Sequence, residues 1–244
     1  MITRVALVPY SPLLIPQLAP GDDRQIAELR HAVLAAARWL RRGANRWRAV
    51  AADADGSGSY AGRRGSFAGY GAAVDVTLSK DVAADFSDAV SGALPLPVLV
   101  AGWLREQAGA DAVTVDVLDP ATPQPDCARI GAELATGDDT ALLVLADGSN
   151  RHGAKSPGGN DDRAPEFDAS IADALRSADA DGLARIDPAL CGKLGAAGRV
   201  AWQVAGGVGA NHCGAACDRD WQATLHYSAA PFGVGYHVAT WEAR

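Results

Sequence analysis

Short apolar runs alternate with longer stretches of helical periodicity along most of this chain. Such runs indicate buried strands, whereas apolar residues spaced by one helical turn indicate the buried face of a helix. The pattern predicts core strands at residues 3–8, 48–52, 112–118 and 141–146. The last of these is the most apolar, as expected for a strand that is covered on both faces. An edge or hairpin strand is expected at 74–78, and two closing strands at 221–227 and 235–241.

Helical periodicity fills most of the segments between these strands. The first helix is expected to begin after Asp22 and Asp23, whose carboxylates can cap it, and to end at Gly43. Further helices are predicted at 97–108 and 128–135, and an interrupted helical region from 167 to about 204. Because strands alternate with helices and no linker divides the chain, we expect one α/β domain over residues 1–244. Its predicted architecture is three-layer α/β/α around a central mixed, mostly parallel sheet.

Composition narrows the class of protein. The chain has 244 residues, enough for a large buried core, and 48% of them are hydrophobic. With 22 basic and 29 acidic residues the net charge is -7, which argues against nucleic acid as a partner. No apolar run is long enough for a membrane span, and we expect no signal peptide. The four cysteines fit no disulfide framework, so a cytoplasmic protein with reduced thiols is expected.

The ends of the predicted core strands carry the candidate chemistry. In an open α/β sheet, ligands bind just beyond the carboxyl ends of the strands. Tyr10 follows the first strand, within a loop that contains three prolines. Asp55 follows the second strand, where a plain Asp-Gly turn is the alternative interpretation. The polar loop that begins at Asp147 follows the most apolar strand and contains Asn150 and His152; the alternative there is a hydrogen-bonded turn with a solvated histidine.

These segments resemble those of the class III extradiol ring-cleavage dioxygenases, in the catalytic-subunit (LigB-type) domain, and of their Memo-like relatives. Residues 9–14, Pro-Tyr-Ser-Pro-Leu-Leu, are similar to a family segment that reads Pro-His, a small residue, Pro, Leu-Leu. The loop from Asp147 resembles the family's Ser-Asp-Leu-Ser-His segment, and residues 191–193 resemble the Memo-like Cys-Gly-Arg segment. Residues 230–241 resemble the ending of a bacterial subgroup, so the resemblance spans nearly the whole chain.

The resemblance implies a site for ferrous iron, which these dioxygenases hold with two histidines and a carboxylate. Tyr10, Asp55 and Cys191 stand at or nearest the three metal-ligand positions, although a cysteine such as Cys191 is also often a small core residue. Asn150 takes the place of the acid/base histidine, and His152 could substitute for it. No histidine occupies a matched ligand position, which argues against classical cleavage of catechols. If the protein is an enzyme, the resemblance implies a non-haem, metal-dependent dioxygenase of the extradiol type.

Two functions therefore remain open. One is an oxidoreductase-superfamily protein with a rebuilt metal site. The other is a non-catalytic protein of the same fold that binds a small aromatic ligand or a protein partner, and a homo-oligomer is plausible for the superfamily. A separate zinc site at His212, Cys213 and Cys217, with His226 or His237, lacks the usual ligand spacing. We expect the last two histidines to pack within the sheet.

Overall fold

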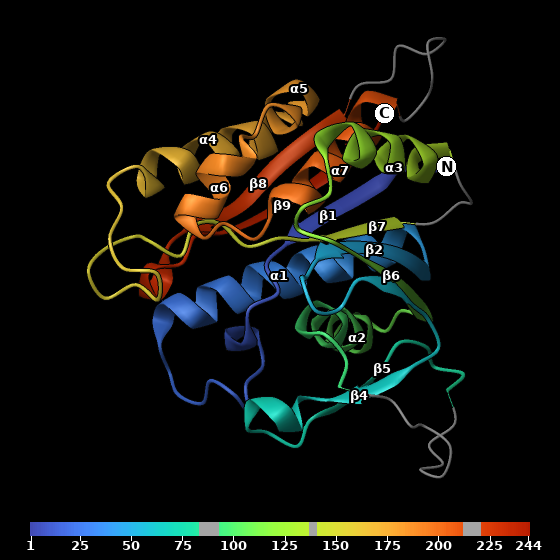
Figure 1. The fold of residues 1–244 in the computed structure, drawn as a ribbon. Helices are drawn as coiled ribbons and strands as arrows, with labels where there is room; N and C mark the ends of the chain where they lie inside the picture. Colours follow the sequence, from blue (N-terminus) through green and yellow to red (C-terminus); the bar gives the residue numbers. More distant parts are fainter. Residues whose placement is uncertain (83–92, 137–140, 212–220) are drawn as a thin grey trace.

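The computed structural model describes residues 1–82, 93–136, 141–211 and 221–244. A seven-stranded sheet runs through it in the order β3-β6-β2-β7-β1-β9-β8 (Figure 1). Its centre is a block of four parallel strands: β1 (Arg4–Val8), β2 (Arg46–Ala52), β6 (Ala112–Leu118) and β7 (Ala141–Leu145). The flanking strands are antiparallel: β3 (Gly58–Tyr60) on one side, and β9 (Tyr236–Ala243) and β8 (Trp221–Ala229) on the other. The prediction of an α/β fold with a mixed sheet and a mostly parallel core is confirmed.

Helices cover both faces of this sheet (Figure 1). One face is packed by α1 (Arg24–Gly43) and α2 (Leu96–Ala108). The opposite face is packed by α3 (Gln124–Thr136), α4 (Ala164–Ser177), α5 (Ala180–Ala184), α6 (Pro188–Leu194) and α7 (Arg199–Asn211). Successive residues of a strand point to opposite faces, so the buried core is divided in two.

Strand β1 shows this division. Ala6 and Val8 pack in the core on the α1–α2 face, whereas Val5 and Leu7 pack in the core on the α3–α7 face. A strand that is buried on both faces needs no polar alternation, and β7 accordingly is apolar throughout.

Most predicted elements have the expected type, with ends that differ by a few residues. Asp23 caps α1 by accepting hydrogen bonds from the N–H groups of Gln25 and Ile26. The interrupted helical region is the succession of α4, α5, α6 and α7. The predicted strand at 74–78 is shorter, β5 (Asp75–Thr77), and forms a separate two-stranded sheet with β4 (Arg64–Ser66), which the periodicity did not predict. Three-residue strands are too short for a clear period.

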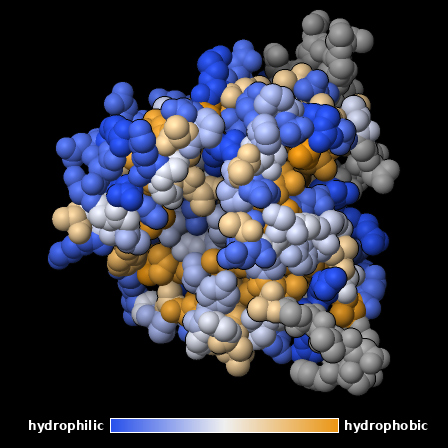
Figure 2. Space-filling model, viewed as in Figure 1, coloured by the Kyte–Doolittle hydropathy of each residue, from blue (hydrophilic) through white to orange (hydrophobic). Residues whose placement is uncertain are grey.

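The surface seen in Figure 2 carries mainly hydrophilic residues, with hydrophobic residues in separate groups between them. Within the described segments, no helix combines the length and the apolar composition that a bilayer crossing requires.

Candidate functional site

Tyr10 and Asp147 lie together just beyond the carboxyl ends of the two adjacent central strands. Val8 of β1 is in register with Leu145 of β7, so both residues stand two positions past their paired strand ends. The backbone N–H of Tyr10 donates a hydrogen bond to Oδ1 of Asp147 at 3.1 Å. The Asp147 side chain is therefore held at the edge of the sheet where α/β proteins bind ligands.

The electrostatics of this pair are unusual. Burial raises the pKa of Asp147 from 3.8 to about 7, because the charged form loses its hydration, although the hydrogen bond from Tyr10 opposes the shift. Burial also raises the pKa of Tyr10, and the negative charges of Asp147 and Asp53 add to the effect. At neutral pH the phenol is therefore protonated, and the Asp147 carboxyl exists in both protonation states. A carboxyl in that condition can accept or donate a proton.

Further polar side chains surround this pair. The hydroxyl of Tyr236, at the start of β9, donates to Oγ of Ser11 at 3.0 Å. Burial raises the pKa of Tyr236 to about 12, and the negative charge of Asp147 adds to the increase. The hydroxyl of Tyr10 forms no hydrogen bond within the described residues. It is therefore the free donor of the group formed by Tyr10, Asp147, Tyr236 and Ser11, which we call the edge site.

A second polar cluster holds the loop after β7 against β9. The buried carboxylate of Asp168, on α4, contacts Nε2 of His152 and lies 3.2 Å from Nε2 of His237. The backbone N–H of Ser149 donates to the same carboxylate at 3.2 Å. The opposite nitrogen of His237, Nδ1, lies 3.0 Å from Oγ of Ser228. One carboxylate thus receives three donors, which fixes the orientation of both imidazole rings.

Glycine is required where the backbone approaches this carboxylate. A Cβ on Gly148 or on Gly235 would overlap the Asp168 side chain. The two glycines are also joined by a hydrogen bond of 2.8 Å from the N–H of Gly148 to the carbonyl of Gly235. The Asp168 cluster is therefore a tightly packed junction between α4, the loop after β7 and the beginning of β9.

The three candidate metal ligands are not brought together in one group. Tyr10 packs in the core on the α1–α2 face, and Cys191 packs in the core on the α3–α7 face. Asp55 is exposed, and its N–H donates to Oδ1 of Asp53 at 2.9 Å, as in an ordinary Asp turn. Asp53, rather than Asp55, exerts the charge effect on Tyr10. A metal-binding role for these residues remains a prediction.

The two candidate catalytic residues have different surroundings. His152 is largely buried against Asp168 and is not the freely solvated side chain of the alternative interpretation. The backbone N–H of His152 donates to the carbonyl of Gly233 at 3.2 Å. The side-chain oxygen of Asn150 is enclosed and has no hydrogen-bond partner within the described residues. Their catalytic role also remains a prediction.

Sequence reasoning missed several residues of these clusters. Asp53 could have been found by the rule that identified Asp147, since both directly follow the apolar part of a central strand. Asp168 and His237 gave no local signal, because one lies on a helix and the other on a strand, 69 positions apart. Tyr236 belongs to the edge site only through the antiparallel pairing of β9 with β1.

The zinc site considered for His212, Cys213 and Cys217 lies partly outside the described residues, which do not include these three. His226 lies 2.8 Å from the hydroxyl of Thr240, and His237 belongs to the Asp168 cluster, so both have partners within the sheet region. Within residues 1–82, 93–136, 141–211 and 221–244, no three His, Cys, Asp or Glu side chains are arranged to hold a metal ion.

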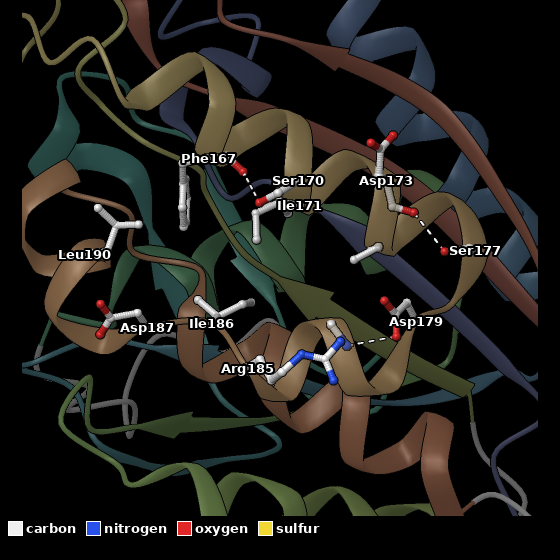
Figure 3. Close-up of a pocket in the computed structure, with 12 residues that line it drawn as sticks. Phe167, Ser170, Ile171, Asp173, Ser177, Asp179, Arg185, Ile186, Asp187 and Leu190 are labelled. Atoms are coloured by element: carbon white, nitrogen blue, oxygen red, sulfur yellow. Dashed lines mark hydrogen bonds between the residues drawn. The ribbon is translucent and has the colours of Figure 1, made fainter.

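A cavity of about 510 Å³ lies between α4, α5 and α6 (Figure 3). Its apolar side chains include Phe167 and Ile171 of α4. Of its carboxylates, Asp179 caps α5 through the N–H of Gly182, and Asp187 caps α6 through the N–H of Ala189. These acids satisfy helix ends, and the cavity does not include the edge site.

Comparison with protein-family models finds no match for this sequence. A comparison with the curated proteins finds no match either.

Proposed function

We propose that this protein binds a small aromatic ligand at the edge site and exchanges a proton with it through Asp147. The ligand class is a phenol or a related aromatic oxygen compound. The observation that carries the proposal is the Asp147 carboxyl, which accepts the backbone N–H of Tyr10 at 3.1 Å and acts on the phenol of Tyr10 as a negative charge, while the phenol hydroxyl has no hydrogen-bond partner within the described residues. A protonated phenol side chain can donate to a ligand oxygen, while the neighbouring carboxylate accepts a ligand proton.

The LigB-like and Memo-like resemblance remains our proposal for the ancestry of the fold. The parallel strand block and the position of Tyr10 after β1 agree with it. Of the two functions that the resemblance left open, the binding protein is favoured, because the residues present do not fit ferrous iron.

The misfit to iron has three parts. Tyr10 has a raised pKa and thus a protonated hydroxyl, which is a poor metal ligand. Burial raises the pKa of the Cys191 thiol to about 12, and a thiol binds metal as the thiolate. Asp55 is exposed in a turn, and Cys191 packs on the face of the sheet opposite to Tyr10.

The test is a titration of the purified protein with catechol, in the presence and absence of a chelator, with tryptophan fluorescence as the signal of binding. We expect saturable binding of catechol whose affinity the chelator does not change. We expect Tyr10→Phe and Asp147→Asn each to weaken this binding. Tyr60→Phe is the matched control, because it removes a tyrosine hydroxyl that is not part of the edge site. That hydroxyl donates to the carbonyl of Gly56 at 2.8 Å.

Two results would overturn the proposal. One is the absence of saturable catechol binding. The other is near-stoichiometric iron retained after anaerobic reconstitution and desalting, lost in Cys191→Ser, together with catechol-dependent oxygen uptake. The second result would establish the rebuilt metal site and the oxidoreductase function instead.

A further inference from the structure

A second cavity, of about 410 Å³, lies at the same edge of the sheet but on the α3–α7 side. It begins at Ala52, the last residue of β2, and is bounded by the loop that follows β6 and by the first turns of α3 and α7. Its volume is in the range of small-molecule sites. Most of the lining is apolar: Ala52, Pro120, Ala121, Pro123, Pro188, Ala196, Ala197 and Val200.

Arg199 is the one cation among the described residues of this lining, and it is buried, with 6% of its surface exposed. Its guanidinium donates to the carbonyls of Pro120 and Thr122 and, at 2.8 Å, to Oε1 of Gln203. All three acceptors are neutral, and no carboxylate within the described residues pairs with Arg199. Arg105, by contrast, is also 6% exposed but pairs with Glu106 at 2.9 Å.

The helix that begins at Arg199 has unpaired donors in its first turn, where Val200 also lines the cavity. The first N–H groups of a helix have no acceptor within the helix and point out of its N-terminus. The N–H groups of Val200 and Ala201 form no hydrogen bond with the described residues, and both residues are buried. Buried N–H groups without a partner are costly, so an acceptor at this helix end would be stabilising. The partial positive charge of the helix terminus favours an anion as that acceptor.

We infer that this cavity is a binding site for a small organic anion, whose carboxylate or phosphate group contacts Arg199 and the N-terminus of α7. The apolar lining accommodates the rest of the ligand. The inference does not depend on the function proposed for the edge site, because the cavity lining includes none of its residues.

Cys191 also lines the cavity, which raises the question of nucleophilic catalysis. Its pKa of about 12 is set mainly by burial, and the opposing charge of Arg199 does not compensate. A protonated thiol is a weak nucleophile, so the inference gives Cys191 no catalytic role.

Ala197 provides a test that leaves Arg199 in place. It is exposed at the rim of the cavity, two residues before Arg199, so a larger side chain need not disturb the core. Ala197→Glu places a carboxylate beside the guanidinium and the end of α7, where it competes with an anionic ligand. Ala197→Gln has nearly the same shape without the charge and is the matched control.

Binding is measured by isothermal titration calorimetry with inorganic phosphate and, separately, with benzoate, at constant ionic strength maintained with sodium chloride. We expect saturable binding of at least one probe, with affinity reduced at least about tenfold in Ala197→Glu and little changed in Ala197→Gln. The tighter of the two probes distinguishes a phosphate ligand from a carboxylate ligand.

Absence of saturable binding of both probes overturns the inference, and so does equal binding by the Glu and Gln variants. Thermal unfolding of both variants shows that they are folded, and the acidic side chain near a helix N-terminus is expected to maintain or raise Tm. A loss of catechol binding at the edge site would leave these results unchanged.

Discussion

The raised pKa of Asp147 makes stability depend on pH in the direction opposite to that of most carboxylates. Asp147→Asn is the perturbation that isolates this effect. The amide has nearly the same shape as the carboxyl, and its oxygen can still accept the N–H of Tyr10. The variant removes only the ionisation, so its free energy of unfolding can be compared with that of the wild type at each pH.

The sign follows from proton binding in the two states. Below pH 3.8 the carboxyl is protonated in both the folded and the unfolded protein. Between pH 3.8 and about 7 the unfolded chain loses this proton while the folded protein keeps it, so the free energy of unfolding falls as pH rises. Above about pH 7 both states are ionised and the difference is constant. A pKa raised to about 7 corresponds to a loss of about 4 kcal/mol at most, which is an upper bound because Asp147 is partly exposed.

The assay is urea unfolding from pH 4 to pH 8, followed by tryptophan fluorescence, since Trp47, Trp202 and Trp241 are fully buried. We expect Asp147→Asn to be more stable relative to the wild type at pH 8 than at pH 4, by up to about 4 kcal/mol. Asp55→Asn, which removes an exposed carboxyl from a neighbouring loop, is the control. If the free energies of unfolding of the wild type and Asp147→Asn changed with pH in parallel, the raised pKa of Asp147 would be refuted. The acid/base role proposed at the edge site would be refuted with it.

Two further predictions concern the Asp168 cluster. Asp168→Asn removes the charge that orients His152 and His237, and we expect a loss of about 3 kcal/mol in urea unfolding; a loss below about 1 kcal/mol would show that the cluster is not structurally important. Gly148→Ala places a Cβ against Asp168 and 2.8 Å from the carbonyl of Gly235, and should cost about 2 kcal/mol in the same assay. Gly192→Ala, where a Cβ meets nothing within 4 Å, should be neutral or stabilising, and equal effects of the two alanines would contradict the packing argument.

The alternation of strands and helices was determined by the sequence, because periodicity and capping are local. The strand at Ala112–Leu118 and the cap at Asp23 were predicted from side chains within a few positions of each other. The strand-end rule also placed Tyr10 and Asp147 at one edge of the sheet. Those two residues contact because β1 and β7 are neighbours, which the sequence alone did not specify.

Only the tertiary structure decided which side chains share a face and which charges are paired. Tyr10 packs in the core on the α1–α2 face and Cys191 in the core on the α3–α7 face, because the loop after β1 turns toward one face of the sheet and α6 covers the other. The neutral acceptors of Arg199 include the carbonyl of Pro120, in the loop after β6, which lies 79 positions away in the chain. Desolvation likewise arises only when distant elements exclude water, which is why the pKa of Asp147 could not be read from its neighbours in sequence.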